Sequence, residues 1–345
     1  MPKTILVSGA NGFIAAHAIE RLLARGDTVV GTVRNPGDNE KTAFLRAMPG
    51  ADKHLRLVAA DLTAPDPFSA HADVDAILHM ASPYVLTVKD AQRDLVDPAV
   101  KGTVSMLEAA AKNPRVKRVV LTSSMAAVTD EPDGRVLTEA DWNKTSSLTR
   151  NPYYFSKTMA ERAAWDFMEK HKPSFDLVVI NPFIVIGPAH TKAINTSNQI
   201  LVDLLNGKFP AIVALSWGFV DVRDVADAHI AALDRLDAKG RYLCVAGRRD
   251  MAQVVALMKS KGYTGNAPSF ELTGGLGTML VKATSYAQPA GVGSYLRTHL
   301  GRTPRFDTSK IQRDLGITFR NVNDTITDTL ADLASAGHIA PAQPV

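Results

Sequence analysis

Residues 152–161, PYYFSKTMAE, place two tyrosines just ahead of a lysine in a stretch of helix-forming residues. Tyr153 precedes Lys157 by four residues and Tyr154 precedes it by three, so either phenol could share a helix face with the ammonium group. A neighbouring ammonium stabilises a phenolate and lowers the pKa of the tyrosine. Such a tyrosine can give or take a proton near neutral pH, which is acid–base chemistry on a substrate oxygen.

A pair of serines follows an apolar run in LTSSMAAV (121–128). Open α/β sheets bind their ligands at the carboxyl ends of the strands. A serine hydroxyl at such an end can hydrogen-bond the same carbonyl oxygen that a tyrosine protonates. Taken alone, Ser123 and Ser124 fit an ordinary turn at the end of a strand better than a catalytic site.

The stretch VSGANGFIAAH (7–17) leads from an apolar run into an amphipathic one. Gly9 and Gly12 lack Cβ atoms, so the backbone can turn tightly and approach a pyrophosphate, while a helix N-terminus supplies N–H donors. Ala15 stands where a third glycine is often found. An ordinary glycine-rich turn is the alternative, but a strand before the loop and a helix after it favour dinucleotide binding.

The residue after the second apolar run indicates which dinucleotide is bound. NAD sites place an acid there, whereas this chain reads GTVRNP with Arg34 in that position. A guanidinium pairs well with a 2′-phosphate, and Lys41 could add a second cation. A solvated loop arginine is the alternative, but the position favours NADPH. Asp61 and Leu62, after the third strand, are expected beside the adenine.

Short apolar runs alternate with amphipathic segments through the first half of the chain. This alternation predicts an α/β fold, a Rossmann-type doubly wound parallel sheet with helices on both faces. The serine pair then ends the fifth strand, and the tyrosines begin the helix after it. The predicted strands are 5–9, 28–33, 55–61, 76–81, 118–124 and 177–182, and the predicted helices are 13–25, 94–112 and 152–170.

After residue 182 the alternation gives way to short elements, with Gly- and Pro-containing loops predicted at 187–198, 262–278 and 288–293. Two later pieces, a helix after Asp221 and a strand at 241–246, still fit the nucleotide-binding sheet. We therefore expect a smaller C-terminal substrate lobe. The expected division is a Rossmann domain over 1–186 that regains 216–246, a substrate-binding lobe over 187–215 and 247–335, and a loose tail over 336–345.

Composition excludes several classes of function. The 39 basic and 35 acidic residues are well mixed, which argues against nucleic-acid binding. No run approaches the ~18 apolar residues of a membrane span, and the chain starts without a basic-then-apolar leader. A single cysteine, Cys244, fits a reducing compartment, so we expect a cytoplasmic protein. The nine histidines include no pair at metal-ligand spacing, so no metal site is expected.

Taken together, the motifs resemble those of the extended short-chain dehydrogenases/reductases. The resemblance covers about residues 3–340 and depends on SGANGFIA, ADL (60–62), HMASP (79–83), TSSMAAV, YYFSKTMAE, INPFIVIGP and FVDVRDVADAHI. Within that family, TVRNP and the ending FDTSKIQRDLGITFR are similar to the dihydroflavonol-reductase-like aldehyde and ketone reductases. The expected fold, activity and cofactor follow from this branch.

The resemblance assigns roles to individual residues. The family's Y-x-x-x-K motif falls on Tyr153 and Lys157, its catalytic serine falls on Ser124, and Tyr154 becomes a packing neighbour. NADPH would then pass a hydride to a ketone or aldehyde, while Ser124 and Tyr153 stabilise the alkoxide and Tyr153 delivers the proton. The expected NADP(H)-binding residues are Gly9, Asn11, Gly12, Phe13, Ile14, Arg34, Lys41, Asp61, Leu62, Ala81, Ser82, Thr122, Tyr153, Lys157, Pro182 and Val185.

The expected substrate pocket is apolar, which indicates a hydrophobic small-molecule carbonyl compound. Thr129 replaces the asparagine that plant flavonoid reductases carry five residues past the serine, which argues against a dihydroflavonol. Two other functions stay open: an NAD-dependent nucleotide-sugar epimerase or dehydratase, and a non-catalytic NADPH-sensing protein. Family members occur as monomers and homodimers. The expected pocket residues are Tyr84, Val85, Met125, Phe183, Ile186 and Trp217.

Overall fold

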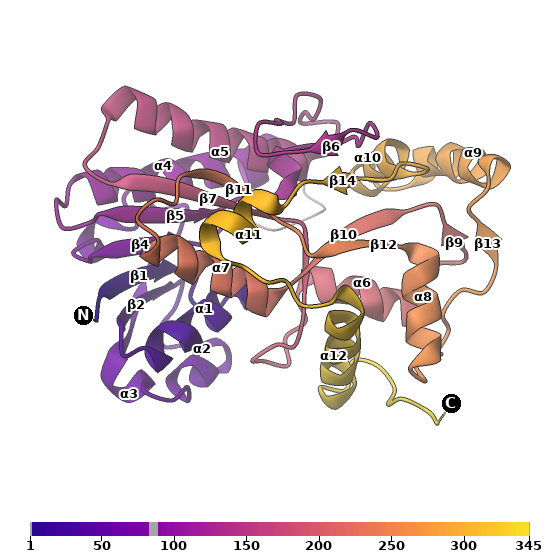
Figure 1. The fold of residues 1–345 in the computed structure, drawn as a ribbon, viewed down its shortest axis with the longest axis horizontal. Helices are drawn as coiled ribbons and strands as arrows, with labels where there is room; N and C mark the ends of the chain where they lie inside the picture. Colours follow the sequence, from indigo (N-terminus) through magenta and orange to yellow (C-terminus); the bar gives the residue numbers. More distant parts are fainter. Residues whose placement is uncertain (1, 83–88, 345) are drawn as a thin grey trace.

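The computed structural model describes residues 2–82 and 89–344, so Tyr84 and Val85 lie outside the described residues. Its central sheet has seven parallel strands in the order β11-β7-β5-β4-β1-β2-β3 (Figure 1). The order reverses after β1, as in a doubly wound sheet. The strands are β1 (Thr4–Ser8), β2 (Thr28–Val33), β3 (Leu55–Ala59), β4 (Ala76–His79), β5 (Arg118–Thr122), β7 (Asp176–Pro182) and β11 (Gly240–Cys244).

Both faces of this sheet are apolar and covered by helices. Along β1, Ile5 and Val7 pack in one core while Leu6 packs in the core on the opposite face. This alternation is the period-2 pattern of a strand that is buried on both sides. The first core is covered by α1 (Phe13–Ala24), α7 (Val222–Asp234) and α11 (Ser309–Leu315), and the other by α4 (Asp97–Ala111) and α5 (Pro152–His171).

Several short elements connect or flank these layers. Two small helices lie between β2 and β3, and single turns precede α4 and follow β5. Two short parallel strand pairs, β6 with β14 and β9 with β13, join distant segments. These elements are α2 (Asn39–Arg46), α3 (Ala51–His54), η1 (Ser69–His71), η2 (Gln92–Val96), η3 (Met125–Ala127), β6 (Val136–Leu137), β9 (Ile212–Val213), β13 (Glu271–Leu272) and β14 (Arg305–Phe306).

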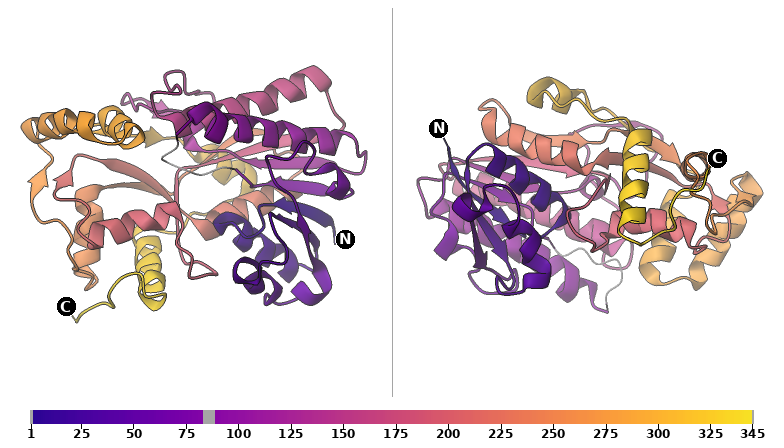
Figure 2. Two further views of the ribbon diagram at one scale, coloured as in Figure 1. Left: turned by 180° about the vertical axis from the view of Figure 1, so that it is seen from behind. Right: turned by 90° about the horizontal axis from the view of Figure 1, so that it is seen from below.

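Apart from the cores on the two faces of the central sheet, a separate core, termed the second core, lies at the other end of the molecule from the N-terminus (Figures 1 and 2). It is built around a three-stranded sheet in the order β12-β10-β8. Trp217 and Phe219 of β10 pack there against helices from the last third of the chain. The elements are β8 (Ile184–Ile186), α6 (Thr196–Leu205), β10 (Ser216–Asp221), β12 (Gly247–Asp250), α8 (Met251–Ser260), α9 (Gly275–Thr284), η4 (Ser285–Ala287), α10 (Ala290–His299) and α12 (Val322–Ser335).

The predicted fold class is confirmed, and each predicted strand and helix is present. Four strands, β3, β4, β5 and β11, end two residues earlier than predicted, although the N–H groups of Ala60 and Ser123 still donate to neighbouring strands. The loops predicted at 187–198, 262–278 and 288–293 were wrong in part, since α6 begins at Thr196, α9 at Gly275 and α10 at Ala290. Glycines in the last two segments hid the helical pattern.

Two segments pack differently from the expected division of the chain. Ile311 and Leu315 of α11 belong to the first core, although the range expected for the substrate lobe included them. Residues 336–344 are docked, since Ile339 is buried in the second core and the Gln343 N–H donates to the Gly262 carbonyl at 2.9 Å. Among the described residues, no helix is both long and apolar enough to cross a membrane.

Candidate active site

Helix α5, which carries the tyrosine–lysine pair, has an anchored start. Pro152 occupies its first turn, where the missing N–H costs nothing. Asn151 ahead of it has a left-handed φ of 49°, a conformation that asparagine tolerates better than most residues. Its N–H donates to Ser294 Oγ at 3.1 Å and its Nδ2 donates to Thr298 Oγ1 at 3.0 Å. The start of α5 is thereby fixed to α10 of the second core.

Tyr153 and Lys157 share one face of this helix. Lys157 Nζ lies 6.0 Å from the centre of the Tyr153 ring. Lys157 is buried, and this burial lowers the pKa of its ammonium group to about 8, while the charge of the Glu161 carboxylate opposes the shift. A cation this close to the phenol stabilises the phenolate, so Tyr153 is suited to act as an acid and base.

Tyr154 faces a different environment. Its Oη is 3.5 Å from His299 Nε2, and its ring lies 6.4 Å from that of Tyr295, both residues of α10. Tyr295 Oη accepts a hydrogen bond from Trp217 Nε1 at 3.1 Å. Tyr154 therefore packs toward the second core, whereas Tyr153 lies beside the lysine.

The two serines after β5 also have different partners. Ser123 is buried, and its Oγ donates to Glu161 Oε2 at 2.5 Å. Ser124 is half-buried, and its Oγ accepts the N–H of Ala126 at 3.1 Å, which starts η3. Thr158 Oγ1, which donates to the Tyr154 carbonyl at 2.8 Å, also lies 3.4 Å from the Ala126 carbonyl, so α5 packs against this turn. Because Ser124 only accepts in that bond, its own proton is available to a substrate oxygen.

A buried network around Glu161 was missed in the sequence analysis. Glu161 Oε2 accepts hydrogen bonds from Ser123 and from Asn181 Nδ2 at 2.7 Å. Its Oε1 accepts from Arg241 Nε at 2.5 Å and from Trp165 Nε1 at 3.3 Å. The network ties α5 to the ends of three neighbouring strands. Only the position of the acid one turn after the lysine was visible in the sequence; its partners on β7 and β11 were not.

The glycine loop has the shape that a pyrophosphate requires. Gly9 has a φ of +67°, and a Cβ there would lie 3.1 Å from the Cα of Ala81. A Cβ on Gly12 would lie 3.0 Å from the Gly9 carbonyl oxygen. Gly12 also precedes α1 and has no side chain to cap it, so N–H groups of the first turn can bind an anion. Ala15, in place of a third glycine, is buried against the sheet.

Two buried histidines hold the strand ends that surround the loop. Ser8 Oγ is 2.8 Å from His79 Nδ1 and also accepts the N–H of Ala81 at 2.9 Å. Thr122 Oγ1 is 2.7 Å from His229 Nε2. Burial lowers the pKa of His79 to about 3 and that of His229 to about 4, so both rings are neutral and have structural roles.

Several residues predicted to bind the cofactor meet in one narrow cleft at the carboxyl ends of β4 and β5. It is bounded on one side by α5 and on the other by the loop after β4. Its lining includes the buried Ser123 and Glu161 together with Ala81, Ser82, Thr122 and Lys157.

Three of the residues predicted to meet the adenosine end of the cofactor, Arg34, Lys41 and Asp61, are exposed. Arg34 follows β2, and its charge is one of the causes, after the hydrogen bonds from Thr63, of the lowered pKa of Asp61. Lys41 Nζ lies 3.3 Å from Asp38 Oδ2, and Asp38 also caps α2. Lys41 thus has an acidic partner. Leu62, the fourth of these residues, is half-buried against Gly102 of α4.

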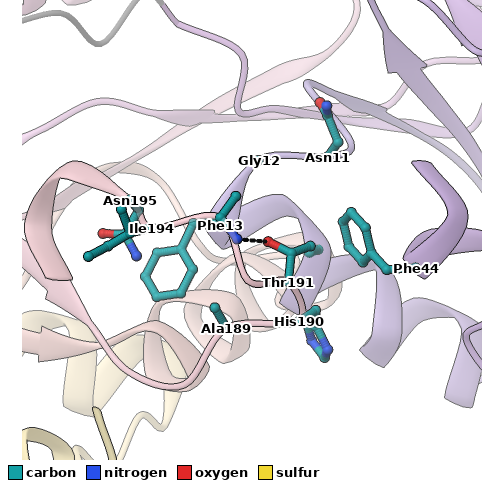
Figure 3. Close-up of a pocket in the computed structure, with 11 residues that line it drawn as sticks. Asn11, Gly12, Phe13, Phe44, Ala189, His190, Thr191, Ile194 and Asn195 are labelled. Carbon is teal, nitrogen blue, oxygen red and sulfur yellow. Dashed lines mark hydrogen bonds between the residues drawn. The ribbon is translucent and has the colours of Figure 1, made fainter. Parts of the chain in front are cut away.

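A larger cleft of about 190 Å³ opens beside the glycine loop (Figure 3). Asn11, Gly12 and Phe13, which were predicted to bind the cofactor, form one wall. The opposite wall is the segment 189–195 after β8, which the sequence analysis did not identify because it carries no recognisable motif. Phe44 of α2 and Asn195 lie at the two sides of the cleft in Figure 3.

The residues predicted to bind the substrate do not gather around one open pocket. Met125 is fully buried in a small core with Leu137 and Leu243, and Trp217 is 3% exposed in the second core. Neither side chain is placed to line an open pocket, because each fills space between packed elements. Phe183 is half-buried against Phe306, with ring centres 5.6 Å apart. The remaining predicted residues, Ile14, Pro182, Val185 and Ile186, lie next to the loop or in β7 and β8, where all but Ile14 are buried.

Comparison with known proteins shows which family the chain belongs to. Residues 5–245 match the model of the NAD dependent epimerase/dehydratase family. Cinnamoyl-CoA reductase CAD2 of Medicago truncatula is 41% identical over 269 residues, which cover 74% of this chain and 80% of that protein. Cinnamoyl-CoA reductase 1 of Arabidopsis thaliana is 35% identical over 345 residues, covering 98% and 91%.

A solved structure of a reductase also matches this chain. Yeast methylglyoxal/isovaleraldehyde reductase Gre2, in complex with NADPH, has a TM-score of 0.79 and 30% identity, covering 97% of this chain and 100% of that one. The cofactor in that crystal is the one that the position of Arg34 predicts here. The chain belongs to the NAD dependent epimerase/dehydratase family, the extended short-chain dehydrogenases/reductases, and its sequence fits the dihydroflavonol-reductase-like branch.

Proposed function

We propose that this protein is an NADPH-dependent carbonyl reductase that converts a hydrophobic ketone or aldehyde into an alcohol. The observation that carries the proposal is the placement of Tyr153 one helical turn before the buried Lys157. The relatives support the class of reaction, since their names describe reduction of cinnamoyl-CoA, methylglyoxal or isovaleraldehyde.

The chain's own residues would handle the proton and the developing charge. Bound NADPH supplies a hydride to the carbonyl carbon. Ser124 donates a hydrogen bond to the carbonyl oxygen as negative charge builds up there, and Tyr153 transfers its proton to that oxygen. Lys157 stabilises the resulting phenolate. Glu161 keeps Ser123 and the strand ends in place without contacting the substrate.

The loop and its surroundings fit the cofactor. Gly9 and Gly12 leave room that a Cβ would fill, and Arg34 offers a cation where NAD-specific sites carry an acid. We propose that residues 1–186 with 216–246 form the cofactor-binding unit, and that most of the remaining chain forms the substrate lobe.

The test is a panel of aromatic and aliphatic aldehydes and ketones with NADPH, followed by absorbance and by identification of the alcohol. We expect carbonyl-dependent oxidation of NADPH with at least one hydrophobic member. Protein that is purified with tightly bound NAD and that leaves added NADPH unchanged with every carbonyl would instead indicate an epimerase.

A further inference from the structure

Three potential metal ligands from distant parts of the chain meet beside the glycine-loop cleft. His17 and Glu20 lie one turn apart on α1, and His190 lies in the loop after β8. His17 Nδ1 is 4.0 Å and His190 Nε2 is 3.5 Å from Glu20 Oε2. The three ligand atoms all lie within 4.8 Å of one another, and the two imidazole rings are 4.3 Å apart at their centres.

The imidazole of His17 offers a lone pair to this point, and the facing nitrogen of His190 is buried. His17 Nε2 is 2.9 Å from the Pro188 carbonyl oxygen, which can only accept, so Nε2 carries the proton and Nδ1 does not. A backbone carbonyl in this position is a usual support for a metal-bound histidine. His17 Nδ1 and His190 Nε2 are both buried, and neither has a hydrogen-bond partner among the residues that the structure describes. Burying such atoms without a partner is costly.

The neighbouring arginine does not occupy the carboxylate fully. Arg21 Nη1 is 3.7 Å from Glu20 Oε2. Its guanidinium also forms an ion pair with Asp227 and donates to the carbonyl oxygens of His17 at 2.9 Å and Arg223 at 3.2 Å. The charge of Arg21 is therefore balanced by another acid, and the oxygens of Glu20 retain lone pairs for a second cation.

We propose that His17, Glu20 and His190 form a binding site for one zinc-class divalent cation, with water as the fourth ligand. Two imidazoles and a carboxylate are a donor set that Zn²⁺ prefers, with metal–ligand distances of about 2.0–2.1 Å. Such distances place tetrahedral ligands about 3.3 Å apart. The atoms here, within 4.8 Å of one another, need to approach by about 1.5 Å at most. Rotation of the half-exposed Glu20 supplies part of that movement.

The ion would join two walls of one cleft. α1 begins at the glycine loop, and His190 lies in the segment that faces Gly12 and Phe13 across the cleft (Figure 3). An ion held by both would fix the loop after β8 to α1. The site therefore acts on the stability and shape of this cleft, and the proton transfer assigned to Tyr153 does not use it.

The experiment uses untagged full-length protein that has been treated with a chelator and dialysed. Titration with Zn²⁺ in a calorimeter should give one equivalent per chain and a higher melting temperature. Co²⁺ should give the visible absorption of a tetrahedral complex. Glu20→Gln and His190→Ala should each weaken binding at least about tenfold. His171→Ala, which removes an exposed histidine at the end of α5, should bind Zn²⁺ like the wild type.

His17 is 5% exposed, so its substitution can disturb folding, and the test depends on the two more exposed ligands. Near-ultraviolet circular dichroism verifies that each variant is folded. Equal Zn²⁺ affinity in the wild type, Glu20→Gln and His190→Ala would overturn the proposal. So would a folded wild type that binds no stoichiometric Zn²⁺.

Discussion

Glu161 and Arg241 form an ion pair that is almost completely shielded from solvent, with side chains 0% and 6% exposed and Arg241 Nε 2.5 Å from Glu161 Oε1. The pair joins α5 to β11, the edge strand of the central sheet. Glu161 lies one turn after Lys157, so the same carboxylate holds α5 against the sheet and raises the pKa of the lysine against the effect of burial.

Glu161→Gln should destabilise the protein by about 3–5 kcal/mol, because it leaves the buried charge of Arg241 without its partner. Urea unfolding of the wild type and the variant measures this difference. Asp234→Asn, which removes the surface pair with Arg25, is the matched control and should cost about 1 kcal/mol or less. A cost for Glu161→Gln as small as that of the control would contradict the structural role.

Tyr153→Phe should lower kcat at least ~100-fold, because it removes the proton donor beside Lys157. Tyr154→Phe is the control, since Tyr154 packs against α10, and its loss should be far smaller. Turnover of both variants is measured on every carbonyl that the wild type reduces. If Tyr154→Phe proved the more damaging change on all of them, the assignment of the acid would be wrong.

Ser124→Ala and Ser123→Ala should separate catalysis from stability. Ser124→Ala removes the hydroxyl assigned to the substrate oxygen, so kcat should fall severely while the melting temperature changes little. Ser123→Ala removes a donor to Glu161, so it should cost about 1–3 kcal/mol of stability and leave kcat nearly intact. Kinetics and thermal unfolding of both proteins test this; the reverse pattern would exchange the roles of the two serines.

Arg34→Ala should raise KM for NADPH by roughly tenfold or more and leave the use of NADH nearly unchanged, because a charge-assisted hydrogen bond contributes about 1.5–3 kcal/mol. Lys41→Ala should have a smaller effect, since Asp38 already pairs with Lys41. The measurement is kcat/KM with each cofactor. Wild-type protein that uses NADH as well as NADPH would exclude the phosphate contact.

Lys157 gives a pH-dependent term in stability. Burial lowers the pKa of Lys157 from its ordinary value of 10.5 to about 8. Between these values the unfolded chain binds more protons at this side chain than the folded protein does, so the free energy of unfolding rises with pH. Below about pH 8 the penalty for the buried charge is fully present. Relative to Lys157→Met, the wild type should therefore gain stability between pH 8 and 10.

Chemical unfolding of the wild type and Lys157→Met at both pH values tests this. Lys170→Met removes an exposed lysine from the same helix. The difference in unfolding free energy between this variant and the wild type should stay the same at pH 8 and pH 10. A stability difference between the wild type and Lys157→Met that stays constant from pH 8 to 10 would show that the lysine is not buried as described.

The parts of the site that follow local rules were predictable from the sequence. Gly9, Gly12, Tyr153 and Lys157 lie within single loops or helix turns, where spacing along the chain determines spacing in the protein. The sheet was predictable for the same reason, because both of its faces are apolar and its strands read as continuous apolar runs.

The parts that depend on distant contacts were not predictable. Arg241 reaches Glu161, and His190 reaches His17, only because elements far apart in the sequence pack together, β11 beside α5 and the loop after β8 beside α1. Met125 and Trp217 were predicted to line the substrate pocket because they stand beside motif residues. The apolar character that suggested a pocket equally suits a core, and packing between elements decided for the core.

The position of β11 in the sequence, far behind its partner strand β7, has a consequence for synthesis on the ribosome. β7 ends at Pro182, and its outer neighbour, residues 240–244, is translated almost sixty residues later. Until then the apolar run DLVVINP has an open edge whose N–H and C=O groups can pair with another nascent chain. Arg241 and its ion pair with Glu161 arrive with the same strand. Cotranslational aggregation, and the need for a chaperone, should therefore peak while the segment between these two strands is being made.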